Sequence, residues 1–368
     1  MITGILREND KENRVCLLPE HIPSLVKKNV SVLVESDAGK ASFADNDQYE
    51  EAGARVRKRD QVLKESDVLL TLNVTADEKI PEGKVLISVL NPLSNRDLVR
   101  KLAERGVVSY SLDMIPRTTR AQAVDVLSSM ATIAGYKAVL VAASHIPHFF
   151  PMFMSASGTI KPSRVLILGA GVAGLQALAT AKKLGAVVEV FDVRSAVREE
   201  VLSLGGKFIE VEGAAEDQAA GGYAVEQSEE YQRKQGELIH KHAVQANVII
   251  TTAQIPGKKA PILIHGTTVD SMKPGSVIID LAAATGGNCE LTRNDETYVH
   301  NRVSIVGNSN LPSTMPSDAS KMLGRNMINF LELMIDSEGA LNLDVDDEVV
   351  QKTCITRNGK IVHERLQE

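Results

Sequence analysis

Residues 165–174 read Val-Leu-Ile-Leu-Gly-Ala-Gly-Val-Ala-Gly, an apolar run that ends in three glycines with Gly-x-Gly-x-x-Gly spacing. The apolar run predicts a buried strand, and the helical period over residues 175–184 predicts a helix directly after the turn. Gly169 permits the tight turn, Gly171 lets backbone N–H groups approach phosphates, and Gly174 lets the helix pack closely on the strand. The stretch therefore predicts a strand, turn and helix that bind the pyrophosphate of a dinucleotide.

A second predicted strand, residues 187–191, ends in Asp192, about 20 residues beyond the first glycines, where a carboxylate can accept both hydroxyls of an adenosine ribose. The same carboxylate repels a 2′-phosphate, which favours NAD(H) over NADP(H). Arg194 works against this preference, because an arginine near this point can accommodate that phosphate. The alternative interpretation is that the three glycines only permit a helix to cross a strand.

The composition indicates a globular protein of two domains. The chain has 368 residues, 43% of them hydrophobic and 24% charged, and this length exceeds what one hydrophobic core normally serves. A formal net charge of −6 does not favour binding to nucleic acid or to an anionic membrane surface. The three cysteines are widely spaced and form no C-x-x-C pair, which favours a reducing compartment.

No segment is expected to span a bilayer, so any membrane role must come through a partner. The first residues meet charge too early for a secretory signal. No metal site is expected either, because His145 and His148 have no cysteine or acid nearby at metal-ligand spacing.

Short β-branched runs alternate with helical-period stretches along the chain, which predicts parallel sheets covered by helices. The fold class expected is α/β, with two Rossmann-like, doubly wound parallel-sheet domains separated by a cleft. We expect an N-terminal domain of residues 1–130 plus about 320–368, and an NAD(H)-binding domain of residues 131–319. Strands are predicted near residues 4–6, 30–35, 67–72, 84–90 and 107–112, and near 164–168, 187–191, 207–211, 247–252, 276–281 and 303–306.

The segment from residue 212 to 237 is polar, acidic and longer than a usual connection between strand and helix. It contains Gly221, Gly222 and Tyr223, which would supply a hinge and an amphipathic tip that can close over a bound ring. A solvated crossover helix with a frayed start is the equally weighted alternative.

Residues 116–129 form a polar stretch after the predicted strand 107–112. Gln122, Asp125 and Ser129 recur near helical spacing and are expected to share one face. One interpretation is a solvated helix start. The other is that side chains of this stretch bind a planar carboxamide such as that of nicotinamide, whose ring must be positioned within about 3–3.5 Å of the atom with which it reacts. The donors and acceptors expected are Arg117, Gln122, Asp125 and Ser128.

Several separate segments together resemble one family, and they occur in the family's order over nearly the whole chain. They are residues 116–122, 125–129, 134–136, 169–176, 221–223, 251–258 and 272–282. The chain resembles the NAD(H)-binding component, domain I, of proton-translocating NAD(P) transhydrogenase, in the alanine dehydrogenase and transhydrogenase superfamily.

The resemblance implies roles for individual residues. Those placed at the nicotinamide carboxamide, as the catalytic set, are Arg117, Gln122, Asp125 and Ser128. Those expected to bind cofactor elsewhere are Thr118, Thr119, Gly169, Gly171, Val172, Gly174, Asp192, Val193, Arg194, Gly222, Tyr223 and Gln254. The sequence departs from the family at Thr118-Thr119, where Ile-Ser is frequent, and at Gln254, where Leu is common.

The resemblance also implies an activity and partners. The expected enzyme is a Si-specific, proton-translocating NAD(P)⁺ transhydrogenase, whose NAD(H) component is a homodimer and passes hydride to NADP⁺ on a partner component. A membrane component moves the protons, so this chain is expected in the cytoplasm, attached peripherally to the inner membrane through its partners.

Two other functions compete with this expectation. Alanine dehydrogenases share the fold, but that family places a lysine and a histidine beside its substrate where this chain has Thr71 and Val89, neither of which titrates. Arg14 is retained, but an arginine cannot act as a base at ordinary pH. A non-catalytic NAD(H) sensor would share every cofactor residue named above.

Overall fold

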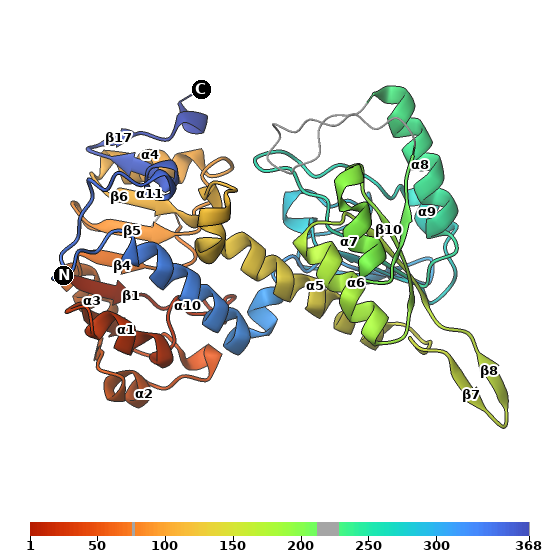
Figure 1. Cartoon of the computed structure of the whole chain (residues 1–368), viewed down its shortest axis with the longest axis horizontal. Coiled ribbons are helices and arrows are strands. Elements are labelled where there is room, and N and C mark those ends of the chain that lie inside the picture. Colours follow the sequence, from red (N-terminus) through yellow and green to blue (C-terminus); the bar gives the residue numbers. More distant parts are fainter. Residues whose placement is uncertain (76–77, 212–227, 368) are drawn as a thin grey trace. The chain divides into compact units, whose positions relative to one another are not determined.

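The computed structural model describes residues 1–75, 78–211 and 228–367 (Figure 1). The chain divides into two compact units, the first formed by Met1–Met130 with Ser313–Glu368 and the second by Ala131–Pro312. Each unit contains a mainly parallel sheet with helices packed on it, so the predicted α/β class with two parallel sheets is confirmed.

The sheet of the first unit has eight strands in the order β17-β16-β6-β5-β4-β1-β2-β3. Six strands are parallel, while β16 runs antiparallel to β6 and β17 antiparallel to β16. The C-terminal part of the chain therefore completes one edge of the N-terminal sheet. The strands are β1 Ile2–Ile5, β2 Ser31–Glu35, β3 Arg55–Arg57, β4 Val68–Leu70, β5 Val85–Ser88, β6 Val108–Ser111, β16 Cys354–Arg357 and β17 Lys360–Ile361.

Both faces of this sheet are buried, because alternate side chains of a strand point to opposite faces. In β2, Val32 and Val34 join one apolar cluster with Phe330 of α10, whereas Leu33 joins a second cluster with Leu102 of α4. The helices of the unit are α1 Ile22–Val26, α2 Asn46–Glu51, α3 Arg59–Glu65, α4 Arg96–Glu104, α10 Pro316–Glu332 and α11 Glu348–Thr353, with α5 Val126–His145 continuing into the second unit.

The sheet of the second unit has the order β11-β10-β9-β12-β13-β15-β14. The chain runs outward from β9 in one direction and returns to β12 on the other side, so the order reverses between β9 and β12. Ligands of open α/β sheets bind at such a point, beyond the carboxyl ends of the strands. The strands are β9 Arg164–Leu168, β10 Val187–Phe191, β11 Lys207–Ile209, β12 Val248–Thr251, β13 Val277–Asp280, β14 Thr297–His300 and β15 Val303–Val306.

The six strands predicted for this unit are all present, and β14 is an antiparallel edge strand that the sequence pattern did not predict. Its helices are α6 Val172–Lys183, α7 Arg198–Ser203, α8 Glu229–Ala243 and α9 Gly266–Asp270. Apolar side chains of α6 cover one face of the sheet and those of α8 and α9 cover the other.

A two-stranded hairpin, β7 Phe153–Ser155 and β8 Gly158–Ile160, extends from the second unit without joining its sheet (Figure 1). Its apolar side chains are exposed, with Met154 at 72% and Ile160 at 45%. The ring of Phe153 stacks on that of Phe149 with a centroid separation of 5.2 Å. The sequence pattern predicted neither this hairpin nor its apolar surface.

Helix α5 is, within the described residues, the one helix long and apolar enough to cross a membrane by length and composition. The sequence prediction that no segment could span a bilayer overlooked it. Its side chains Ala138, Val139 and Ala142 are fully buried in the core of the second unit. A β-carbon on Gly135 would lie 2.1 Å from the carbonyl oxygen of Ala173, so α5 packs tightly against α6. A core helix passes the same test of length and composition, so this evidence for a membrane span is weak.

Candidate functional site

The glycine turn joins β9 to α6, and its three glycines face different surroundings. Gly169 has φ +104°, a left-handed conformation that other residues rarely adopt. A β-carbon on Gly174 would lie 1.9 Å from the carbonyl oxygen of Gly169, so only glycine lets the helix approach the turn. Gly171 is the N-cap of α6, and no heavy atom lies within 4 Å of the place where its β-carbon would be.

The open space at Gly171 therefore lies at the start of a helix of 12 residues. The first N–H groups of a helix have no partner within the helix and attract anions. Backbone space together with these donors makes a cradle that fits the pyrophosphate of a dinucleotide. Val172, the first residue of α6, is 42% exposed beside it.

Asp192 follows β10 and contacts the glycine turn directly. Its Oδ2 atom accepts a hydrogen bond of 2.7 Å from the backbone N–H of Ala170, between the first two glycines. The next residue but one, Arg194, donates from its backbone N–H and from Nε to Oδ1, at 2.9 Å each, and from a terminal nitrogen to Oδ2 at 2.7 Å. This pairing raises the pKa of the Arg194 guanidinium.

The carboxylate of Asp192 is thus buried and accepts four hydrogen bonds within the protein. A carboxylate offers about four lone-pair positions, so a ribose hydroxyl must replace one of these donors. The Arg194 side chain is the donor that can move without disturbing the main chain. Val193, between the two, is half-buried and packs against the apolar cluster beneath α8.

The loop after β12 meets the same turn. Thr252 donates from its backbone N–H to the carbonyl of Leu168 at 2.9 Å, and its hydroxyl lies 3.2 Å from the carbonyl oxygen of Gly169. Gln254 is exposed, and its Nε2 donates to the carbonyl of Leu281, just after β13, at 2.8 Å. The carboxyl ends of β9, β10 and β12 therefore bring together the glycine turn, Asp192 and the Gln254 loop. Gly222 and Tyr223 lie outside the described residues.

The polar stretch 116–129 belongs to the first unit. Arg117, Thr118, Thr119 and Gln122 are exposed. The carboxylate of Asp125 accepts hydrogen bonds from the backbone N–H of Ser128 at 2.9 Å and from its hydroxyl at 2.6 Å. Asp125 therefore caps the start of α5, a common role for an aspartate before a helix.

The expectation that Gln122, Asp125 and Ser129 share a helix face is wrong. Residues Thr119–Val124 form a 3-10 helix, α5 begins at Val126, and Asp125 between them has ψ 88°, outside the helical range. The side chain of Asp125 competes for backbone donors and so breaks the helix, which the spacing pattern alone does not reveal.

The 3-10 segment is held by the C-terminal helices of its own unit. The side-chain amides of Asn326 and Asn329, both on α10, donate to the carbonyl of Ala123 at 2.9 and 2.8 Å. Arg120 pairs with Asp347, the N-cap of α11. The sequence pattern does not reveal these supports, because the partners lie far away along the chain.

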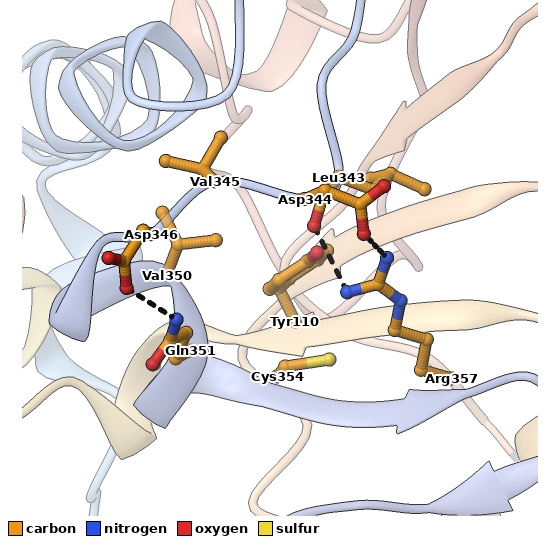
Figure 2. A pocket seen from close by; sticks show the side chains of 9 residues that line it. All are labelled: Tyr110, Leu343, Asp344, Val345, Asp346, Val350, Gln351, Cys354 and Arg357. Atoms are coloured by element: carbon orange, nitrogen blue, oxygen red, sulfur yellow. Dashed lines mark hydrogen bonds and ion pairs between the residues drawn. The ribbon is translucent and has the colours of Figure 1, made fainter.

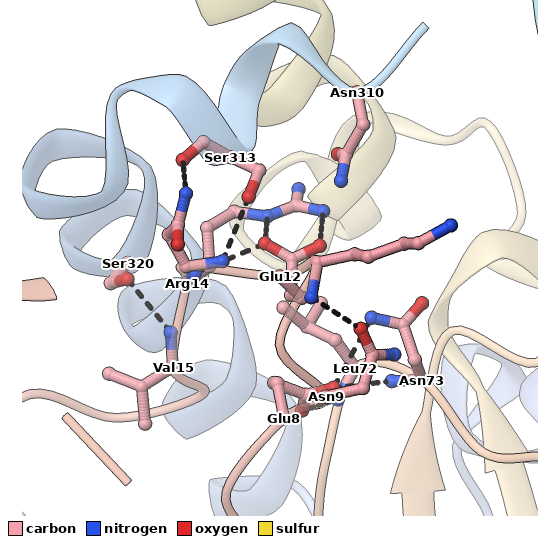
Figure 3. A network of polar contacts seen from close by, with 12 residues as sticks. Glu8, Asn9, Glu12, Arg14, Val15, Leu72, Asn73, Asn310, Ser313 and Ser320 are labelled. Atoms are coloured by element: carbon pink, nitrogen blue, oxygen red, sulfur yellow. Dashed lines mark hydrogen bonds and ion pairs between the residues drawn. The ribbon is translucent and has the colours of Figure 1, made fainter. Parts of the chain in front are cut away.

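A polar network lies beyond the carboxyl ends of β1 and β4 in the first unit (Figure 3). The buried Glu8 carboxylate accepts from the Thr71 hydroxyl at 2.7 Å, from the N–H of Leu72 at 2.6 Å, and from the N–H and side-chain amide of Asn73 at 3.1 and 3.2 Å. Burial raises the pKa of the Glu8 carboxyl, although these four donors favour its ionised form.

Arg14 in the same network forms a bidentate pair with Glu12, with distances of 2.7 Å from Nε and 2.6 Å from a terminal nitrogen (Figure 3). Both side chains are largely buried. Glu8 was not among the predicted site residues. Its position just after the first strand is the signal in the sequence that could have identified it.

A small pocket of about 220 Å³ lies elsewhere in the first unit, between β6, β16 and α11 (Figure 2). Its one arginine, Arg357, donates to Asp344 at 2.6 Å and to the carbonyl of Leu343 at 3.1 Å. Ligand pockets usually exceed about 300 Å³, so this one is too small for a dinucleotide. None of the predicted site residues lines it.

Among the described residues, no group of three or more His, Cys, Asp and Glu side chains is arranged to hold a metal ion. The three cysteines are buried and unpaired, and burial raises the pKa of Cys289 and of Cys354 to about 11. Reactive cysteines are exposed and have lowered pKa values, so these two serve packing.

Two family models match the chain. The alanine dehydrogenase/PNT C-terminal domain matches residues 138–364, and the corresponding N-terminal domain matches residues 4–134. Together they account for almost the entire sequence.

Individual proteins are similar over the same length. The chain is 45% identical over 367 residues to the first of the separate chains that make up NAD(P) transhydrogenase subunit alpha in Rhodospirillum rubrum, covering 96% of each. It is 42% identical over 367 residues to NAD(P) transhydrogenase subunit alpha of Haemophilus influenzae, covering 98% of this chain and 71% of that protein. The crystal structure of transhydrogenase from Sinorhizobium meliloti has a TM-score of 0.89 and 39% identity, covering 98% of this chain and 100% of that one.

Proposed function

Because the chain belongs to the alanine dehydrogenase/PNT family, with transhydrogenase alpha subunits as full-length relatives, we propose that it is the NAD(H)-binding component of a proton-translocating transhydrogenase. The observation that carries the proposal is the glycine turn of the second unit. Gly171 leaves open space at the start of α6, and Asp192 stands directly beside it. This combination fits a pyrophosphate and an adenosine ribose.

The arrangement around Asp192 supports a preference for NAD(H) over NADP(H). A 2′-phosphate at the ribose would approach a buried carboxylate. The Arg194 guanidinium, which could have neutralised that phosphate, is directed at Asp192 instead. The charge available to a second phosphate is therefore reduced.

The proposal places the nicotinamide end of the cofactor at Arg117, Gln122, Asp125 and Ser128, with Thr118 and Thr119 beside them. The bound coenzyme supplies a hydride to NADP⁺ held by a partner component. Arg117 and Gln122 are exposed and can donate to a carboxamide oxygen, while the Asp125–Ser128 pair fixes the start of α5 against which the amide is oriented. Gly222, Tyr223 and Gln254 are proposed to close around the coenzyme.

The partners proposed are an NADP(H)-binding component and a membrane component that translocates protons. The names of the relatives, which are subunits or portions of subunits, support the need for partners. The burial of α5 in the core of the second unit supports a peripheral attachment on the cytoplasmic face rather than insertion of this chain.

A homodimer is also proposed, and the hairpin β7–β8 supports it. Met154, Phe153 and Ile160 expose a continuous apolar strip that a single chain leaves in water. Exposed apolar patches of this kind mark interaction surfaces. Light scattering after gel filtration tests the point: the wild type should elute as a dimer, and Met154→Glu should shift it to a monomer. A monomeric wild type at micromolar concentration would contradict the dimer.

The alternative activity, oxidative deamination of an amino acid, needs an acid or base beside the substrate. Thr71 occupies one position where the related dehydrogenases have such a group, and its hydroxyl donates to Glu8. Val89 occupies the other and packs against the apolar core. Glu8 itself accepts four hydrogen bonds and has no lone-pair position left for a substrate proton.

Hydride exchange between NADH and an NADP⁺ analogue, in the presence of a transhydrogenase NADP(H)-binding component, tests the proposal against both alternatives. The proposal predicts exchange well above the rate of either component alone, and no NADH from L-alanine with NAD⁺. Binding of NADH without exchange would favour a sensor, and rapid NADH formation from alanine would restore the deaminase.

A further inference from the structure

The loop of residues 253–261 follows β12 and carries Gln254, Lys258 and Lys259, all exposed to solvent. Only a few contacts fix such a loop, so the residues that close it decide where Gln254 lies. One buried side chain, Asn288, contacts both of its ends.

Asn288 lies in the segment after β13 and is fully buried. Its Oδ1 accepts a hydrogen bond of 3.0 Å from the N–H of Ala253, and its Nδ2 donates to the carbonyl of Ala253 at 2.9 Å. The same Nδ2 donates to the carbonyl of Pro261 at 2.8 Å. The amide therefore holds the first and last residues of the loop together and uses both of its donors to do so.

The backbone of Asn288 extends the same connection. Its carbonyl accepts from the N–H groups of Leu263 and Ile264, at 2.8 and 3.0 Å, directly after the loop. With these bonds, the segment after β13 binds the loop at its start, at its end and beyond it.

Asp280, the last residue of β13, holds Asn288 in place. Its fully buried carboxylate accepts from the N–H groups of Asn288 and Cys289, at 2.8 and 3.0 Å, and from the hydroxyls of Thr251 and Thr292, at 2.9 and 2.6 Å. A β-carbon on Gly287 would lie 2.8 Å from Oδ2 of Asp280, so the chain must pass the carboxylate at a glycine. Asn288 is thus fixed at the carboxyl edge of the sheet before any ligand binds.

We propose that Asn288 is a positioning residue that closes the loop 253–261 and so presents Gln254 to NAD(H). The part of this inference that concerns NAD(H) rests on the proposed function. Asn288 itself lies beneath the loop, and its amide is used up by loop backbone groups, so it acts through the loop and not by touching the coenzyme.

Asn288→Asp tests the inference with almost no change in shape. The substitution keeps the acceptor for Ala253 N–H but turns the two-fold donor into an acceptor that faces two carbonyl oxygens. Trypsin cleavage after Lys258 and Lys259, in the absence of nucleotide, reports the closure of the loop directly. We expect cleavage about tenfold faster, because the loss of one well-formed hydrogen bond is worth about a factor of ten.

The affinity for NADH, from the fluorescence of the bound coenzyme, is the second measurement. We expect Asn288→Asp to raise the Kd about tenfold at about pH 8, and the difference to narrow toward about pH 5.5, where the buried acid gains a proton and regains a donor. Gln254→Ala should weaken NADH binding while trypsin cuts at the wild-type rate.

Matched controls separate the possible failures. Asn294→Asp makes the same change at an exposed asparagine nearby and should alter neither measurement. Asn288→Ala removes the same contacts without a charge and serves if the aspartate variant does not fold. Wild-type cleavage and wild-type NADH affinity in the folded Asn288 variants would overturn the inference. If the wild type binds no NADH, the proposed function fails, while the cleavage rates still test the closure of the loop.

Discussion

The guanidinium of Arg194 donates to both carboxylate oxygens of Asp192, from Nε at 2.9 Å and from a terminal nitrogen at 2.7 Å. The same carboxylate accepts from the N–H of Ala170 in the glycine turn. The residue proposed to bind the adenosine ribose is therefore tied both to the turn that would hold the pyrophosphate and to a side chain that can leave.

Asp192→Ala should weaken NADH binding by about tenfold or more, because hydrogen bonds to a charged group each contribute about 1.5–3 kcal/mol. It should also reduce the discrimination against NADPH, since the repulsion of a 2′-phosphate is removed. Titration with both coenzymes checks the prediction. Asp270→Ala, at an exposed aspartate paired with His300 in the same unit, is the control and should change neither affinity. Unchanged binding of both coenzymes to Asp192→Ala would refute the assigned contact.

Arg194→Ala should have the smaller effect on NADH. The ribose hydroxyls can only reach Asp192 if this side chain moves away, so its removal costs an ion pair in the free protein but not a contact in the complex. We expect the NADH affinity to stay within about threefold, which is about 0.7 kcal/mol. A loss as large as that of Asp192→Ala would show that Arg194 itself binds the coenzyme.

Gly171 and Gly174 should separate binding from stability. Gly171 has φ −76° and open space around it, so Gly171→Ala should keep the thermal stability but weaken NADH binding, because the methyl group occupies the phosphate cradle. Gly174→Ala should destabilise the fold by about 1–3 kcal/mol or more, since its β-carbon meets the carbonyl of Gly169. Calorimetric unfolding and NADH titration of both variants decide this. The pair of assignments fails if Gly171→Ala unfolds early while binding normally.

Gln122→Asn should slow hydride exchange far more than it weakens NADH binding. The shorter side chain shifts the ring without removing the adenosine contacts. Its support is intact, because the 3-10 segment stays anchored through Ala123 to Asn326 and Asn329. Single-turnover exchange and equilibrium binding should be measured side by side, with Gln351→Asn as the control at an exposed glutamine of the same unit. Equal losses in rate and affinity would argue against a positioning role.

The buried thiol of Cys289 should make the fold less stable at alkaline pH. Burial raises its pKa from 9.0 to about 11, so the folded state keeps the proton longer than the unfolded chain. This contribution is fully present below pH 9 and is lost as the pH rises through 11, up to about 2.7 kcal/mol for a shift of two units. Urea unfolding between pH 9 and 11 should lose less stability in Cys289→Ala than in the wild type. The same slope in both would contradict the assignment.

The sequence predicted the elements whose signal is local. The apolar runs of β9, β10 and β15 have their predicted bounds, because buried parallel strands are short and bounded by turns. The hairpin β7–β8 and the edge strand β14 were missed, since exposed strands carry no continuous apolar run. The core helix α5 was not recognised as long and apolar, because Gly135 and the small residues around it diluted the signal.

The candidate site could be predicted only as far as each residue acts alone. The roles of Gly169 and Gly174 follow from their spacing, and their backbone conformation and close contacts agree with those roles. The helix break at Asp125 could not be predicted, because it depends on a side chain that bonds the next turn. Asn288 was missed because its partners, Ala253 and Pro261, lie on a different loop.

A crystal structure of the protein soaked with NADH tests the central claim most directly. The account predicts the pyrophosphate at the N-terminus of α6 beside Gly171, the adenosine ribose on Asp192 with the Arg194 side chain displaced, and Gln254 against the coenzyme. NADH bound at another place, or a glycine turn that stays closed to it at saturating concentration, would contradict the account.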